Sequence, residues 1–156
     1  MSQSEDEMAL IEQIQKEMIE AMKAKEALRL SVLRGLKTAL KNKEIEKMRA
    51  LNENEEIQVL QTLVKQRKES IEQFTKGGRP ELAEQEQAEL KIIETYLPAA
   101  VGREEIERAV SEAIAEVQAG SAKDMGRVMK AVMAKFAGKV VDGKLVNEMV
   151  RAKLGG

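Results

Sequence analysis

The few helix-breaking residues of this chain constrain its fold more than any other feature of the sequence. Among 156 residues there are only two prolines and ten glycines, and the stretches between them are rich in Ala, Glu, Lys, Leu and Met. Those residue types favour helix, and no segment shows the two-residue period of a strand. The sequence therefore predicts an all-α protein.

The breakers divide the chain into helical segments. Gly77 and Gly78 form a left-handed stop signal, Pro80 suits the first turn of a helix, and Pro98 ends one. A small kink or break near Lys23–Lys25 separates the first two segments. Helices are predicted over residues 5–23, 24–52, 53–76, 80–97, 103–118, 123–137 and 143–154.

The segment TYLPAAVGREE is the predicted domain boundary. It separates an N-terminal domain of long helices, residues 1–98, from a small C-terminal bundle of three short helices, residues 99–156. The second part is small enough that its core alone would be marginal. Ser4 with Glu7 predicts a capping box at the first helix, and Ser121 a cap at the sixth.

The composition narrows the possible chemistry. The chain has no Cys, His or Trp, which excludes thiol nucleophiles, disulfides, imidazole bases, His-type zinc sites and Ser-His-Asp triads. We predict no catalytic residue, no metal and no cofactor. The N-terminus lacks the basic start and apolar core of a signal peptide, and no apolar run is long enough to span a membrane. A cytoplasmic location without a membrane partner is the expectation.

The segment GKVVDGKL, residues 138–145, matches seven of the eight positions of a phosphate-binding P-loop. Leu145 stands where Ser or Thr should hold magnesium, and the preceding segment has helical rather than strand spacing. We interpret the segment as a helix-loop-helix turn in which Gly138 ends one helix and Asp142 caps the next. Lys139 and Lys144 would then project, and could meet a phosphate at a helix N-terminus.

Three charged residues fall inside apolar stripes at helical spacing: Arg29, Arg67 and Glu89. A hairpin that turns at Gly78 puts Arg67 and Glu89 at equal distances from the turn, so the sequence predicts an ion pair between them. Glu86 is a second candidate acceptor. The pair could be a catalytic carboxylate tuned by arginine, but a structural pair that fixes register is the commoner use.

Basic residues gather on the exposed face of the second predicted helix. The formal net charge is −1, yet residues 23–43 hold seven basic residues and one acidic residue. Lys23, Arg34, Lys37 and Lys41 share one arc and predict a ridge about 27 Å long. Nucleic-acid phosphates match it in spacing and sign, while a solvated helix face is the alternative. Scarce aromatics favour contacts to the backbone of structured RNA over base stacking.

Several ordered blocks of the chain resemble the YqeY family, also called GatB/YqeY-domain proteins. The blocks are LRLSVLRGLKTAL, LVKQRKESIEQFTKGGRPEL, IIETYLP and KDMGRVMKAVMAKFAGKVVDGKLVNEMV, and together they cover most of the chain. Val140 and Val141 depart from the small residue usual in the family's turn. The resemblance implies two all-helical domains and kinship with the tail of the B subunit of glutamine-dependent tRNA amidotransferases.

The resemblance also implies a function, because such modules are associated with gripping the body of tRNA. The expectation is a standalone module that binds tRNA or assists tRNA metabolism, with an aminoacyl-tRNA synthetase or an amidotransferase as possible partner. The matching candidate contacts in the C-terminal part are Lys123, Arg127, Lys130, Lys139 and Lys144. Two alternatives are carbon–nitrogen ligase activity with glutamine as amide donor, an inherited family label, and a protein–protein adaptor built on Met125, Met129 and Met133.

Overall fold

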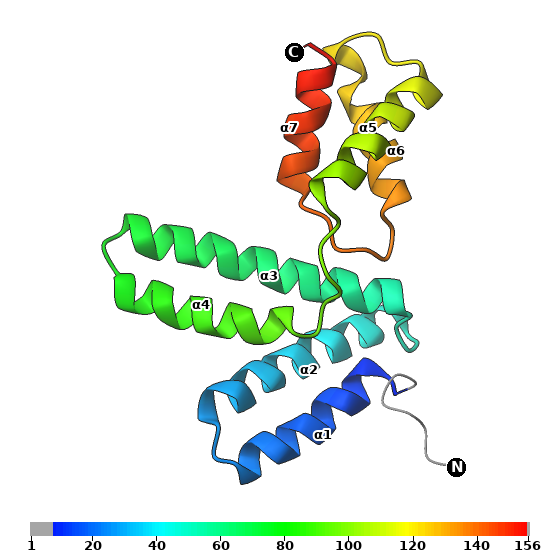
Figure 1. The fold of residues 1–156 in the computed structure, drawn as a ribbon. Coiled ribbons are helices and arrows are strands. Elements are labelled where there is room, and N and C mark those ends of the chain that lie inside the picture. Colours follow the sequence, from blue (N-terminus) through cyan, green and yellow to red (C-terminus); the bar gives the residue numbers. More distant parts are fainter. Residues whose placement is uncertain (1–7, 156) are drawn as a thin grey trace. The chain divides into compact units, whose positions relative to one another are not determined.

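The computed structural model describes residues 8–155, and this part of the chain is all-helical without a named strand (Figure 1). The predicted all-α class is therefore confirmed for these residues. The predicted capping box of Ser4 and Glu7 lies outside the described residues. The seven α-helices and one short 3-10 helix are α1 (Leu10–Lys23), α2 (Ala27–Lys47), α3 (Glu53–Lys76), α4 (Pro80–Glu94), α5 (Arg103–Val117), η2 (Ala122–Asp124), α6 (Met125–Lys135) and α7 (Gly143–Lys153).

The first of two compact units spans Met1–Leu97. In it α1 and α2 form one helical hairpin, α3 and α4 form a second, and α2 packs against both α3 and α4 (Figure 1). The core lies where the apolar stripes of these helices meet. Its most deeply buried side chains are Ile14, Leu33, Leu36, Leu40, Leu60 and Ile93.

The second unit spans Pro98–Gly156 and contains α5, α6 and α7. Its core consists mainly of alanine and β-branched residues, together with Phe136 and Met149. Its fully buried side chains include Ile106, Val110, Val128, Val132, Val146 and Val150. One backbone bond, from Val101 N to Val140 O at 2.8 Å, ties the segment before α5 to the loop between α6 and α7. The predicted boundary after residue 98 lies one residue from this division, and the independence of the two parts stays a prediction.

The start of α2 differs from the predicted helix over residues 24–52. Lys25 has a φ of 58°, and Glu26 N donates to Ala21 O at 2.9 Å, which closes α1 with a left-handed turn. Lys23 is therefore the last residue of α1 and is not on α2. The prediction that Lys23 belongs to a four-cation ridge along one helix is wrong, because the chain reverses direction after it.

The turn at Gly138–Leu145 confirms the interpretation as a helix-loop-helix connection. It joins α6 to α7, with Gly138 at a φ of 79°, where only glycine is unstrained. Asp142 Oδ1 accepts hydrogen bonds from Lys144 N at 3.0 Å and Leu145 N at 3.3 Å. Val141 packs against the core of the second unit. Capping chemistry thus accounts for the residues that resemble a P-loop.

Candidate nucleic-acid interface

The side of α2 opposite its buried stripe carries three cations: Arg34 and Lys41 are exposed, and Lys37 is half-buried. Their spacing puts them within a narrow arc, away from the buried stripe of Val32, Leu33, Leu36 and Leu40. They rise about 10 Å along the helix axis. Within residues 8–155, no carboxylate lies within ion-pair distance of any of the three. This cation face is positioned by a helix whose other side is anchored in the core.

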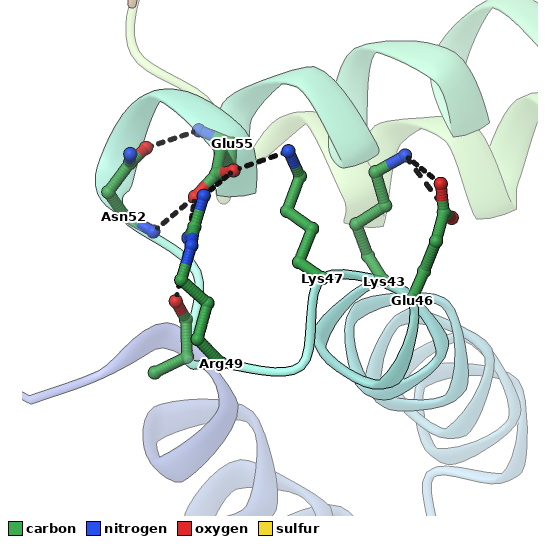
Figure 2. Close-up of polar contacts among 7 residues, drawn as sticks. Lys43, Glu46, Lys47, Arg49, Asn52 and Glu55 are labelled. Atoms are coloured by element: carbon green, nitrogen blue, oxygen red, sulfur yellow. Dashed lines mark hydrogen bonds and ion pairs between the residues drawn. The ribbon is translucent and has the colours of Figure 1, made fainter.

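The neighbouring cations at the C-terminal end of α2 are engaged by carboxylates. Lys43 Nζ contacts Glu46 Oε1 at 3.3 Å, and Lys47 Nζ contacts Glu55 Oε2 at 2.8 Å (Figure 2). Arg49, just beyond the helix, makes two bonds to Glu55, at 2.7 and 2.8 Å. Paired cations have less capacity to meet a phosphate, so the positive potential of α2 lies toward its middle.

Glu55 is the centre of the α2–α3 corner shown in Figure 2. It also accepts from Asn52 N at 3.0 Å, and Asn52 Oδ1 accepts from Glu55 N at 2.9 Å, which makes a capping box. The bonds from Arg49, then Asn52 and Lys47, hold the pKa of this carboxyl well below its usual range. The sequence interpretation missed this cluster, although Asn at one position and Glu three later is a known helix-start signature.

All five cations proposed for the second unit are exposed, but they are not equally available. Arg127 Nη2 contacts Asp124 Oδ1 at 2.9 Å, and Lys139 Nζ contacts Glu105 Oε1 at 3.3 Å. Asp124 is held as a carboxylate because its pKa is lowered, first by the backbone N–H of Gly120 and then by Arg127. The other three have no ion pair within the part of the chain that the structure describes: Lys123, Lys130 and Lys144.

Arg67 and Glu89 are brought together across the α3–α4 hairpin. Arg67 Nη1 contacts Glu89 Oε2, and it also donates to Glu86 Oε2 at 2.9 Å. Glu89 is 8% exposed, so its charge depends on this partner. The contact links two antiparallel helices at one level, which is the geometry of a register-fixing pair.

The described residues offer little for a metal site, a membrane span or an apolar docking surface. Between residues 8 and 155, no group of three or more His, Cys, Asp or Glu side chains could hold a metal ion. The helices of the same range are all too short or too polar to cross a membrane. Met125 and Met129 pack against the core of the second unit, while Met133 is 40% exposed. A methionine stripe that is mainly internal argues against the adaptor alternative.

A model of the family described as Yqey-like protein matches residues 11–154. The chain belongs to the YqeY family. The resemblance seen in the sequence is thereby confirmed, and it extends over both compact units of this YqeY protein.

Relatives of this YqeY protein carry the name "Altered inheritance of mitochondria protein 41, mitochondrial". The one from Kluyveromyces lactis is 35% identical over 136 residues, which are 85% of this chain and 71% of that protein. The one from Lachancea thermotolerans is 38% identical and covers 67% of this chain, which spans 58% of that protein. The one from Pyrenophora tritici-repentis is 27% identical over 157 residues, which are 99% of this chain and 86% of that protein.

These names correct one expectation. The cytoplasmic location predicted from the N-terminus of this YqeY protein is contradicted, because all three relatives are named as mitochondrial proteins. The prediction rested on the composition of a short terminal segment, and composition alone distinguishes compartments poorly.

Proposed function

We propose that this YqeY protein binds structured RNA, with tRNA as the expected ligand, by contacts to the phosphate backbone. The observation that carries the proposal is the cation face of α2, where Arg34, Lys37 and Lys41 lie on one rigid helix. None of the three is paired with a carboxylate within residues 8–155. Cations in this state release counterions from phosphates on binding, which is the main source of RNA affinity.

The second unit contributes further support. Lys123, Lys130 and Lys144 are exposed cations without an ion pair in the described range. The described residues place few aromatic side chains at the surface, since Phe136 is buried and Phe74 and Tyr96 are partly buried. Contacts would therefore be to backbone and shape rather than to stacked bases. The proposed partner is an enzyme that itself holds tRNA, either an aminoacyl-tRNA synthetase or an amidotransferase.

The test is the affinity for total tRNA of a triple variant, Arg34→Gln with Lys37→Gln and Lys41→Gln, measured by fluorescence anisotropy over a range of salt. We expect the dissociation constant to rise about tenfold or more at moderate salt. The slope of log affinity against log salt should fall by about 2 to 3, because each phosphate contact contributes about 0.9.

The matched control removes three charges elsewhere in the same unit, with Lys65→Gln, Lys68→Gln and Lys91→Gln. These lysines are exposed and have no ion pair within residues 8–155, so the net charge changes equally. Equal loss in both triple variants would mean a general charge effect and would refute a specific cation face. Absence of tRNA binding by the wild-type chain at low salt would refute the proposed function itself.

A further inference from the structure

A cavity in the first unit is separate from the surface proposed for RNA. It has a volume of about 440 Å³ and lies between α1, α2 and the end of α4. Its polar wall consists of Gln13, Glu17, Arg29, Thr95 and Tyr96, and Leu10 and Ile92 add apolar surface. Pockets for small molecules commonly measure about 300–1,000 Å³ and combine apolar walls with a few polar groups, as this one does.

Arg29 is a charged residue within an apolar stripe of α2, and it lines this cavity. Its carboxylate contacts are long, because Nη2 donates to Glu17 Oε1 at 3.4 Å and Nη1 lies 3.6 Å from Glu26 Oε2. An interaction with the Tyr96 hydroxyl is the main cause that raises the pKa of Arg29. Arg49, by comparison, donates two hydrogen bonds of 2.7 and 2.8 Å to Glu55. Because a guanidinium has five N–H donors, Arg29 retains capacity for a closer bidentate partner.

Glu17 is fixed in place beside this arginine. Tyr96 Oη donates to Glu17 Oε2 at 2.9 Å, and the Glu17 side chain remains 22% exposed. Burial raises the pKa of Tyr96 to about 12, so the phenol stays protonated and keeps donating over the physiological range. The cavity wall therefore presents one fixed carboxylate and one guanidinium with spare donors side by side.

The charge of the wall decides the class of ligand. A simple anion would be attracted by Arg29 but repelled by Glu17, and a simple cation would meet the reverse. An apolar molecule would remove water from both charges without replacing it. A zwitterion satisfies both, with its carboxylate on Arg29 and its ammonium on Glu17.

We propose that this cavity binds a free α-amino acid with a polar, uncharged side chain. The side-chain preference follows from the rest of the wall. The side-chain amide of Gln13 makes no hydrogen bond within the described residues. The Thr95 hydroxyl donates to Ile92 O at 2.7 Å but can still accept. The proposal does not depend on RNA binding, because no cavity residue belongs to the α2 cation face or to the second unit.

Isothermal titration calorimetry of the whole chain with L-serine, L-asparagine and L-glutamine tests the proposal. Each is compared with its N-acetyl and α-carboxamide forms, which lack the ammonium and the carboxylate respectively. We expect saturable binding of at least one free amino acid, weakened about tenfold or more by either cap. Equal binding of a capped form or of acetate would identify a simple ion site and overturn the proposal, as would absence of saturable binding at millimolar concentration.

Two variants test the assigned groups. Glu17→Gln removes the charge but keeps an acceptor for Tyr96, and Arg29→Lys keeps the charge but loses the fork. Each should weaken the amino acid about tenfold or more, whereas Glu20→Gln, an exposed change one turn away on α1, should not. Wild-type affinity in Glu17→Gln overturns the assignment. If a variant fails to fold, the wild-type chain is titrated with the amino acid and followed by NMR. The backbone amide signals of Gln13, Arg29 and Thr95 should then shift. Shifts confined to other residues would overturn the proposed site.

Discussion

The arginines of the first unit differ in how completely carboxylates engage them, and the difference separates their roles. Arg49 and Glu55 form a closed bidentate pair next to a capping box, so they fix a corner. Arg67 is shared by two carboxylates of α4. Arg29 lies 3.4 Å from Glu17 and 3.6 Å from Glu26, and it also interacts with the Tyr96 hydroxyl. The same residue type thus serves as a cap partner, a cross-helix tie and a cavity wall.

At this scale we predict a pH dependence that belongs to Glu55. Its carboxyl pKa in the folded protein lies far below its ordinary value of 4.5, chiefly because Arg49 bonds its ionised form. A carboxyl group whose pKa is lower in the folded than in the unfolded protein stabilises the fold when the pH is above its unfolded pKa. This stabilisation is lost as the pH falls toward the folded pKa. The stability advantage of wild type over Glu55→Gln should be constant above about pH 5 and should shrink steadily below about pH 4.5.

Urea unfolding followed by circular dichroism at pH 7, 5, 4 and 3 measures this difference. The matched control is Glu46→Gln, which removes an exposed carboxylate from the same corner (Figure 2). Its difference from wild type should change much less over this range. A Glu55→Gln difference that stays constant down to pH 3 would contradict the role assigned to the Glu55 carboxylate.

Among the helices, the ends that the sequence predicted correctly are those with a chemical signal at the end itself. The α3 helix spans the predicted 53–76, and its stop is followed by Gly78 at a φ of 72°. The end of the second helix is misplaced, because the helix predicted to run to residue 52 ends at Lys47, where Met48 adopts a φ of 60° without being glycine. No glycine or proline near Met48 marks this left-handed turn, so the sequence does not signal the end of α2 there.

Contacts within one hairpin could be predicted from the sequence, whereas contacts between hairpins could not. Arg67 and Glu89 are related by one hairpin, and their spacing from Gly78 was enough to predict their contact. Glu17 and Tyr96 lie 79 residues apart, and their contact depends on how two hairpins pack. The cavity between them could therefore not be derived from helical periodicity, although Arg29 in an apolar stripe marked one of its walls.

The ion pair of Arg67 and Glu89 between α3 and α4 gives a prediction about how these two helices are held together. Arg67→Met leaves Glu89, which is 8% exposed, without its counter-ion, and we expect a loss of about 1–3 kcal/mol of stability. Adding Glu89→Leu should recover most of the loss, because an apolar pair replaces the buried ion pair. Chemical unfolding of the single and double variants measures both effects.

The control for this pair is Lys76→Met on the same helix, which breaks the exposed contact with Glu72 and should change stability little. A double variant as unstable as Arg67→Met would mean that Glu86 or the helix packing, rather than the Glu89 charge, dominates. Wild-type stability of Arg67→Met would remove the structural role of the pair.

Both compact units carry cations that have no ion pair within residues 8–155. One set lies on α2 of the unit ending at Leu97, and the other lies on residues of the unit beginning at Pro98. Each unit has its own buried core, and the helices of each are held by contacts within that unit. A ligand as large as tRNA could engage both sets, in which case the linkage between units raises the affinity without any new contact.

We predict that division of the chain weakens RNA binding more than removal of either cation set by itself. Fragments 1–98 and 99–156, each shown to be helical by circular dichroism, should bind total tRNA at least about tenfold more weakly than the whole chain, alone or mixed, because only linked sites share an effective concentration. If a fragment does not fold, variants of the whole chain replace the fragments. The replacement combines the α2 triple variant with Lys123→Gln, Lys130→Gln and Lys144→Gln. Affinity of one fragment equal to that of the whole chain would show that the other unit does not take part in binding.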